Sequence, residues 1–298
     1  DRRGRITALF DRLADLLLIH NDVGDLERLL RTIRRLTGPE DRVIRENVLA
    51  IEHIVEHWSA QPFVDRITSH LNHDEFPYTP SVVAICNLLS RRAVPHIARV
   101  VGRVHDRGVR EKLLRIVKEK ITGQQRAVAD LLRDADRQLA HDLFQILAKV
   151  EDPDDVQYAI NTALENPEPS VRLEAVSLIP LDRLEMYRPA LFQALSDFTK
   201  PVRSKAVHLL ARLPTKAVAQ KIFAVISGES FKDYELDEKR RFHAAAALTG
   251  YEVSYWMERF STSGLLASKQ SEQDRHCAAI ALGIRLHRPA VEALTKEL

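Results

Sequence analysis

The chain has 298 residues, of which 45% are hydrophobic and 29% are charged, so a disordered chain is excluded. The net charge of +2 points to no particular class of partner. Glycine is scarce, at ten residues, and the apolar positions are mainly Ala, Leu, Val and Ile, without alternating β-branched runs. This composition predicts an almost wholly helical protein. We find no run of about eighteen apolar residues, so no membrane span is expected.

The N-terminal residues 5–20 form an apolar segment that charged residues interrupt, which predicts an amphipathic helix and not a secretory signal. We assign residues 1–24 to an N-terminal capping helix and residues 25–298 to one continuous array. Cys86 and Cys277 stand in unrelated contexts and are interpreted as buried thiols of a reducing compartment, so we expect a cytoplasmic protein. Because the first residue is not Met, we also expect a fragment or a processed form.

The sequence repeats itself about every thirty residues. The motif V-R-x-x-A-V-x-x-L occurs at Arg172 and again, without a gap, at Arg203. The same frame recurs along the whole chain at nearly equal intervals, and a period of this length predicts stacked structural repeats. The anchor positions are Arg45, Thr79, Arg110, Ala140, Arg172, Arg203, Arg241 and Arg275.

Each repeat contains two helical patterns separated by a turn. The predicted first helices are 25–36, 62–71, 93–104, 124–133, 154–166, 184–198, 215–227 and 252–261. The predicted second helices are 40–57, 79–90, 106–119, 136–149, 171–179, 201–213, 237–249 and 272–286. A single helix pair cannot bury its apolar faces, whereas stacked pairs share a continuous core. We therefore predict an all-α fold, an α-solenoid in which about eight helix pairs form a right-handed superhelix, with an incomplete last repeat.

Two turns carry a resemblance to a known family. The segments N-P-E-P-S-V-R, ending at Arg172, and D-F-T-K-P-V-R, ending at Arg203, are each followed by A-V-x-x-L. They resemble HEAT repeats of the short bacterial type. The resemblance implies that Asn166, Asp197 and the two arginines form a structural ladder between neighbouring repeats, broken where Thr79 and Ala140 replace Arg. The signature of tetratricopeptide repeats and the third helix of armadillo repeats are not visible.

In HEAT-like stacks the second helix lines the concave face. Positions two and five after the anchor belong neither to the buried stripe nor to the ladder, so we expect them to project into the groove. The leading hypothesis is a non-catalytic scaffold, part of a larger bacterial signalling or assembly protein, that binds another protein or a peptide there without a cofactor. The candidate groove residues are Lys112, Arg115, Asp142, Gln145, Glu174, Ser177, Lys205, His208 and His243, with Cys277 near the C-terminal end.

The charge is unevenly distributed along the chain. Residues 91–126 contain eleven Lys and Arg against three Asp and Glu, whereas residues 127–168 contain three against ten. A solvated surface explains such bands, and the alternative is a basic band that contacts the phosphates of a nucleic acid. The basic segment lacks aromatic residues for base stacking, and the acidic band would repel a duplex. The residues of the predicted basic band are Arg99, Arg103, Arg107, Arg110, Lys112 and Arg115.

The spacing between Arg203 and Arg241 is longer than the others and marks an insertion at residues 227–239. Phe231 and Tyr234 make this insertion more apolar than a solvated loop requires. Two interpretations remain open: the insertion recognises a partner, or its side chains fill the gap between stacked repeats.

No segment of the sequence carries a strong motif for metal binding or for catalysis. The pair His53 and His57 lies in H-I-V-E-H, which differs from the zinc motif H-E-x-x-H, and the segment around His70 and His73 lacks a second ligand cluster. We therefore predict no metal site and no enzyme.

Alkylpurine DNA glycosylases resemble this chain in their HEAT-like architecture and are the third hypothesis. Those enzymes use a groove Asp together with Trp and Arg residues. Here Trp58 and Trp256 are about two hundred residues apart, so they are not expected to share a groove.

Overall fold

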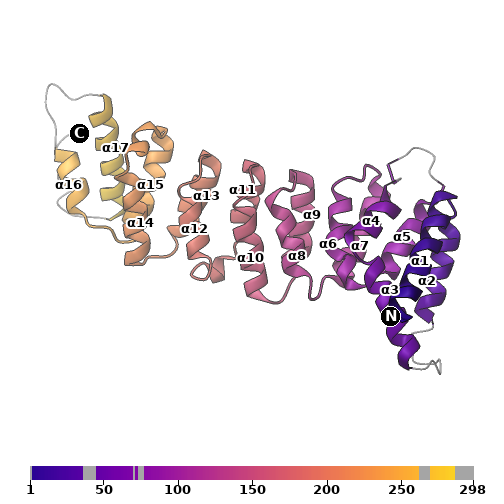
Figure 1. The fold of residues 1–298 in the computed structure, drawn as a ribbon. Coiled ribbons are helices and arrows are strands. Elements are labelled where there is room, and N and C mark those ends of the chain that lie inside the picture. Colours follow the sequence, from indigo (N-terminus) through magenta and orange to yellow (C-terminus); the bar gives the residue numbers. More distant parts are fainter. Residues whose placement is uncertain (1, 36–44, 70, 73–76, 262–268, 286–298) are drawn as a thin grey trace. The chain divides into compact units, whose positions relative to one another are not determined.

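The computed structural model describes residues 2–35, 45–69, 71–72, 77–261 and 269–285 (Figure 1). This part of the chain is helical throughout and contains no strand, which confirms the all-α prediction. None of its helices combines the length and the apolar composition that crossing a membrane requires. The chain divides into two compact units between Thr162 and Ala163, and each unit is described by itself.

The helices of the first unit lie within a few residues of the predicted ranges. They are α1 (Arg2–Ile19), α2 (Val23–Arg35), α3 (Arg45–Trp58), α4 (Gln61–Thr68), α5 (Thr79–Leu88), α6 (Val94–Val101), α7 (Arg107–Lys120), α8 (Gln125–Ala129), α9 (Arg137–Leu147) and α10 (Pro153–Ala163), of which the last residue falls beyond the division.

The first unit contains two rows of packed helices. In one row α2 packs against α5 and α5 against α7, and in the other α4 packs against α6 and α6 against α8. Pairs such as α6 and α7, or α8 and α9, connect the rows. These rows are what alternating first and second helices would produce, because each helix buries its apolar stripe against the next copy.

The first predicted pair is arranged differently. The frame makes the helix at 40–57 the neighbour of α5, but α2 occupies that place and α3 packs against α1. The reason is the distribution of apolar residues: α2 buries a regular stripe, whereas α3 is anchored near its C-terminal end. There Trp58 stacks on Phe63 at 5.0 Å and donates a hydrogen bond from Nε1 to Asp11 Oδ1 at 2.8 Å.

Cationic side chains tie the C-terminal ends of this row together. Arg34 Nε, near the end of α2, donates to the carbonyl of Leu88 at 2.7 Å. Lys120 Nζ, at the end of α7, donates to the carbonyl of Leu89 at 2.8 Å. The last carbonyls of a helix lack partners within it and carry partial negative charge, so these cations stabilise the end of α5 from both sides.

The N-terminus of α7 provides a first test of the local energetics. Asp106 precedes the helix, and its Oδ1 accepts a hydrogen bond from the backbone N–H of Val109 at 2.7 Å. We expect Asp106→Ala to lower the free energy of unfolding by about 1 kcal/mol, because this N–H loses its partner. Urea unfolding followed by circular dichroism measures the change, and Asp106→Asn, which retains the acceptor, should cost clearly less. Equal losses in both variants would contradict a capping role.

The second unit continues the alternation of helices. It contains α11 (Pro169–Ser177), α12 (Arg188–Ala194), α13 (Lys200–Leu210), α14 (Lys216–Ile226), α15 (Leu236–Leu248), α16 (Ser254–Ser261) and α17 (Lys269–Ile284). The predicted second helices pack in order, α11 against α13, α13 against α15 and α15 against α17. Contacts of α12 with α13, of α14 with α15 and of α16 with α17 form the pairs.

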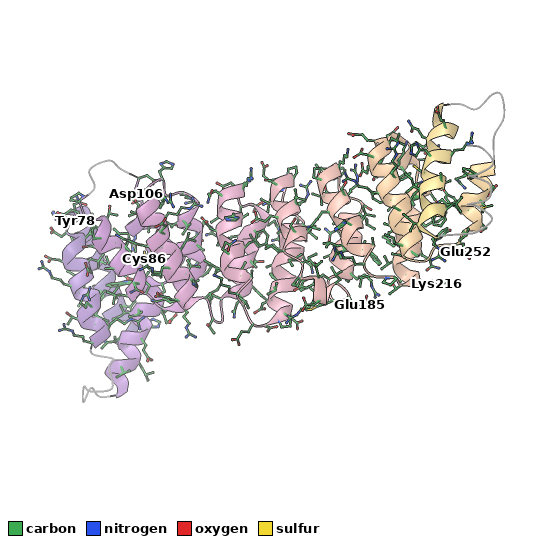
Figure 2. The ribbon with its side chains drawn as sticks, turned by 180° about the vertical axis from the view of Figure 1, so that it is seen from behind. Tyr78, Cys86, Asp106, Glu185, Lys216 and Glu252 are labelled. Carbon is green, nitrogen blue, oxygen red and sulfur yellow. The ribbon has the colours of Figure 1, made fainter. Side chains whose placement is uncertain are left out.

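Both cysteines are buried free thiols, as expected. Cys86 lies inside the first unit among the helices of the row (Figure 2). Burial raises the pKa of Cys86 to about 12 and that of Cys277 to about 11. The thiolate is the reactive form, so neither cysteine is a nucleophile at neutral pH.

Candidate binding groove

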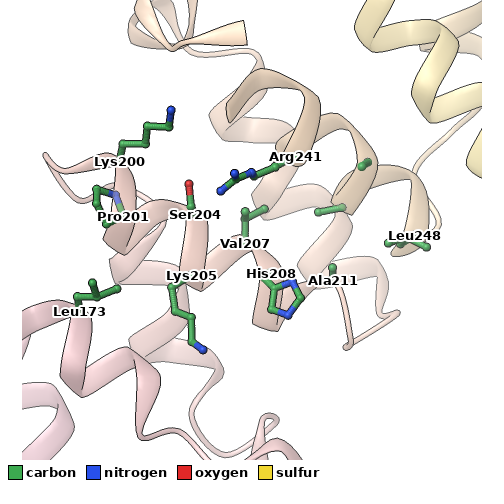
Figure 3. A pocket seen from close by; sticks show the side chains of 12 residues that line it. Leu173, Lys200, Pro201, Ser204, Lys205, Val207, His208, Ala211, Arg241 and Leu248 are labelled. Atoms are coloured by element: carbon green, nitrogen blue, oxygen red, sulfur yellow. The ribbon is translucent and has the colours of Figure 1, made fainter. Parts of the chain in front are cut away.

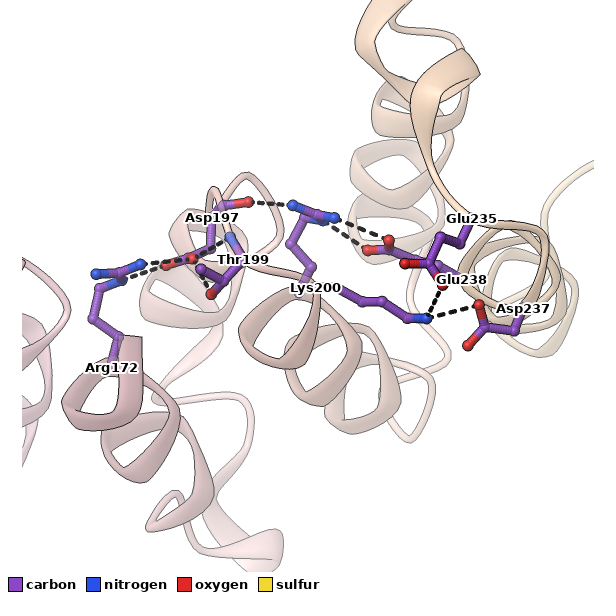
Figure 4. A network of polar contacts seen from close by, with 8 residues as sticks. Arg172, Asp197, Thr199, Lys200, Glu235, Asp237 and Glu238 are labelled. Carbon is purple, nitrogen blue, oxygen red and sulfur yellow. Dashed lines mark hydrogen bonds and ion pairs between the residues drawn. The ribbon is translucent and has the colours of Figure 1, made fainter. Parts of the chain in front are cut away.

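Two buried arginines of the second unit form the predicted ladder (Figure 4). Arg172 Nε and Nη2 donate to the carboxylate of Asp197 at 2.7 and 3.0 Å, and Nη1 donates to the backbone carbonyl of Asn166 at 2.8 Å. Arg203 repeats this geometry with Glu238 at 2.7 and 2.9 Å and with the backbone carbonyl of Asp197 at 2.8 Å. Each guanidinium thus ties the turn before its own helix to the next repeat, through paired charge-assisted hydrogen bonds.

The ladder governs the ionisation of Asp197. Burial alone would raise the pKa of Asp197, but hydrogen bonds from Arg172 and from Thr199 outweigh it and hold this pKa below its ordinary value. Asp197 is therefore ionised at neutral pH and belongs to the architecture of the repeat.

The next position of the ladder is Lys239 and not Arg241. Lys239 is 3% exposed, and its Nζ donates to the backbone carbonyl of Lys232 at 2.6 Å and to Gln273 Oε1 at 3.3 Å. The buried positions of α15 match those of α13 when Lys239 is aligned with Arg203. The matching pairs are Val202 and Glu238, Arg203 and Lys239, Ala206 and Phe242, and Val207 and His243. The predicted anchor in α15 is therefore wrong by two residues.

This shift overturns the assignment of His243 to the groove. His243 is 4% exposed, and its Nδ1 accepts a hydrogen bond from Trp256 Nε1 at 3.0 Å. Burial, helped by the charges of Arg259 and Lys239, lowers the pKa of His243 to about 4. The prediction for Cys277 is wrong as well, because this residue is 1% exposed.

The insertion fills the gap between repeats, the second of the two interpretations. Phe231 is 6% exposed and packs edge-on against Phe242, with ring centroids 5.6 Å apart. The guanidinium of Arg203 lies over the ring of Tyr234 at 4.1 Å, a cation–π contact that shields the ladder. Phe231 is therefore a core residue, and its assignment as a recognition residue is wrong.

Asp142 is also part of an interhelical pair. Its carboxylate accepts hydrogen bonds from Arg110 Nε and Nη2 at 2.8 and 2.5 Å, and both side chains are largely buried. The prediction that Asp142 projects into the groove outside the ladder is therefore wrong, because Arg110 holds its carboxylate. Ala140 itself supplies no guanidinium at the anchor position. The carboxylate two residues after Ala140 links the neighbouring repeat.

The remaining predicted groove residues are at least partly accessible. Lys112 and Arg115 are exposed on α7, and Gln145 is exposed on α9. In the second unit Ser177 and His208 are exposed, whereas Glu174 and Lys205 are half-buried. Of these seven residues, Lys205 and His208 lie together at a hollow in the described surface.

The predicted basic band is divided among several elements. Arg99 lies on α6, Arg103 on the turn that follows, and Arg107 on α7, where it pairs with Glu111 at 2.9 Å. Arg110 is held by Asp142. Part of the positive charge is therefore neutralised within the first unit.

The other sequence candidates for chemistry are the histidine pairs and the two tryptophans. Within the described ranges no cluster of His, Cys, Asp and Glu could hold a metal ion, and His57 Nε2 lies 3.1 Å from Asp11 Oδ2. His70, His73 and Asp74 lie outside the described residues. Trp58 and Trp256 are both fully buried in this structure, so neither offers a face to a base.

A hollow of about 690 Å³ lies between α11, α13 and α15 on the face of the second helices (Figure 3). Aliphatic side chains form most of its surface, and cationic and hydroxyl groups surround them. The apolar residues are Leu173, Pro201, Val207, Ala211, Ala244, Ala245 and Leu248, and the polar residues are Lys200, Ser204, Lys205, His208 and Arg241. We call this site the α13–α15 groove.

The polar groups of the groove differ in what they bind. Lys200 is neutralised by Glu235 at 2.7 Å and by Asp237 at 2.8 Å. Arg241 approaches Asp237 only at 3.6 Å. No described residue forms a hydrogen bond or an ion pair with Lys205 or His208, and Ser204 Oγ is buried without a partner in the described chain. The groove thus combines an aliphatic surface with the unpaired ammonium of Lys205 and the loosely held guanidinium of Arg241, an arrangement suited to binding a ligand.

Sequence reasoning missed Arg241, Ser204 and Leu248 as groove residues. The misplaced anchor hid Arg241, which stands two residues after Lys239 as Lys205 stands two after Arg203. The sequence does contain a signal for the correct anchor. When Phe242 and His243 are aligned with the A-V pair of the motif, Lys239 falls at the anchor position, as in the structure. Comparison with protein-family models and with curated proteins found no match to this chain.

Proposed function

We propose that the chain is a HEAT-like α-solenoid, a non-catalytic scaffold that binds another protein through the face of its second helices. The ordered packing of α11, α13, α15 and α17 and the ladder between repeats support the repeat architecture. The proposal includes a cytoplasmic location and membership of a larger bacterial signalling or assembly protein.

The observation that carries the proposal is the α13–α15 groove. It lies on the face that the repeat frame assigns to recognition, and it contains Lys205, a cation without a partner in the described chain, beside exposed aliphatic surface. Such unpaired charge costs little in solvent and becomes favourable against a partner of opposite sign.

Affinity capture with the purified chain tests this proposal. We expect Lys205→Glu combined with Arg241→Glu to lose partner proteins that the parent chain retains. The matched control is Lys216→Glu combined with Lys221→Glu, which reverses the same number of charges on exposed residues of α14. Recovery of the same partners with the groove variant and with the parent would contradict the proposal.

The second candidate function is nucleic-acid binding, which the exposed Lys112 and Arg115 of α7 favour. Gel-shift titration at several salt concentrations tests it, because phosphate contacts weaken steeply as salt rises. The absence of a shift at low salt would exclude this function for the intact chain.

A further inference from the structure

We propose that the α13–α15 groove binds an acidic peptide segment whose aliphatic side chains enter the hollow between Asp or Glu residues. The inference rests on the proposed function and adds to it the chemistry of the partner.

The lining of the α13–α15 groove is positively charged. Among the described residues that line the groove, none is Asp or Glu, whereas Lys205 and Arg241 are cations, of which Lys205 has no partner in the described chain and Arg241 lies 3.6 Å from Asp237. Lys200 is excluded from this count because Glu235 and Asp237 already hold it. A ligand with carboxylates would complete the groove, while a basic ligand would be repelled.

The apolar part of the groove is aliphatic. Its apolar part consists of Leu, Val, Ala and Pro side chains, and Leu248 is 53% exposed at one end. None of the described lining residues is aromatic, so the groove offers no platform on which a base could stack. Aliphatic side chains of a peptide fit this surface better than the bases of a nucleic acid, and a purely ionic ligand would leave the apolar surface in water.

Ser204 places a buried hydroxyl group at the groove. This residue is 9% exposed, and its Oγ has no hydrogen-bond partner in the described chain. Figure 3 shows the guanidinium of Arg241 extending from α15 toward the Ser204 hydroxyl on α13. Buried polar groups are seldom left unpaired, and rotation of the Ser204 side chain would let it donate to a carboxylate held by Arg241. The pair therefore defines one carboxylate position.

Selection from a phage-displayed library of random peptides on the full chain tests the inference. The library is first depleted on the Lys205→Glu, Arg241→Glu variant, so that the surviving peptides need the groove. We expect enriched peptides to contain Asp or Glu next to Leu, Ile or Val. Enrichment of basic peptides, or no enrichment over the variant, would overturn the inference.

A synthetic copy of the most enriched peptide is then used to measure separately what the cations, the aliphatic contacts and the Ser204 hydroxyl contribute to the affinity. We expect fluorescence polarisation to show binding weakened by roughly tenfold or more when Lys205 and Arg241 become Glu. Replacing the leucines of the peptide with Ser should weaken binding comparably, whereas Lys216→Glu with Lys221→Glu should leave it unchanged. Ser204→Ala should weaken binding of this peptide more than of a copy whose carboxylates are amides; equal effects would remove Ser204 from the carboxylate position.

Two failures can be told apart. If affinity capture still depends on Lys205 and Arg241 but no acidic peptide is enriched, the inference about chemistry fails and the proposed function stands. If neither experiment depends on these residues, both fail. Stronger binding of a single-stranded oligonucleotide than of the selected peptide would assign the groove to nucleic acid instead.

Discussion

Replacing Arg203 with Met is expected to lower the free energy of unfolding of the second unit by about 3 kcal/mol or more. The variant leaves the carboxylate of Glu238, which is 1% exposed, without the two hydrogen bonds it accepts from Arg203. It also removes the cation over the ring of Tyr234. Urea unfolding followed by Trp256 fluorescence, in a Trp58→Phe background, reports on the second unit alone.

A neighbouring arginine provides the matched control. Arg241→Met removes an exposed side chain whose closest carboxylate oxygen, from Asp237, is 3.6 Å away, so its effect should stay below about 1 kcal/mol. Adding Glu238→Gln to Arg203→Met should restore part of the loss, because the uncompensated buried charge disappears. Equal effects of Arg203→Met and Arg241→Met would show that the ladder does not stabilise the stack.

Acid is expected to destabilise the second unit through His243. Its pKa is about 4 in the folded state against an ordinary value near 6.5, so below pH 6.5 the unfolded chain binds a proton that the folded chain excludes. Stability from the neutral imidazole is complete above pH 6.5 and falls as the pH is lowered toward 4. Between pH 7 and pH 4.5 the loss should be about 2 kcal/mol.

His243→Gln isolates this contribution from other titrating groups. The Gln side chain can accept the hydrogen bond from Trp256 Nε1 but cannot be protonated in this range. We measure the free energy of unfolding of both proteins at pH 7 and at pH 4.5. The decrease between these two pH values should be about 2 kcal/mol smaller in the variant than in the parent. Parallel pH profiles for the two proteins would mean that His243 is accessible to protons in the folded state.

The periodicity of the sequence predicts the helices well because each repeat solves the same packing problem. The range 106–119 became α7 at Arg107–Lys120, and 215–227 became α14 at Lys216–Ile226. The arrangement of the first pair could not be predicted in this way. Whether α2 or α3 lies beside α5 depends on which apolar stripe is more continuous in three dimensions, and both helices have an acceptable pattern in sequence.

The site was harder to predict than the helices. A shift of two residues on a helix rotates a side chain by more than half a turn, so the error at Arg241 moved His243 from the core to the predicted groove. Lys239 in place of Arg, together with the insertion at residues 227–239, obscured the frame. The positions Lys205 and His208 were found because α13 retains the full motif.

Photo-crosslinking tests the central claim, that recognition lies on the face of the second helices. A photoreactive residue replaces His208 or Leu248, which line the groove and are exposed, or Gln220 or Ala224, which are exposed on α14. We expect a partner retained by the parent chain, or the selected acidic peptide, to crosslink from positions 208 and 248 and not from α14. Crosslinking from α14 alone would place recognition on the first helices and contradict the account.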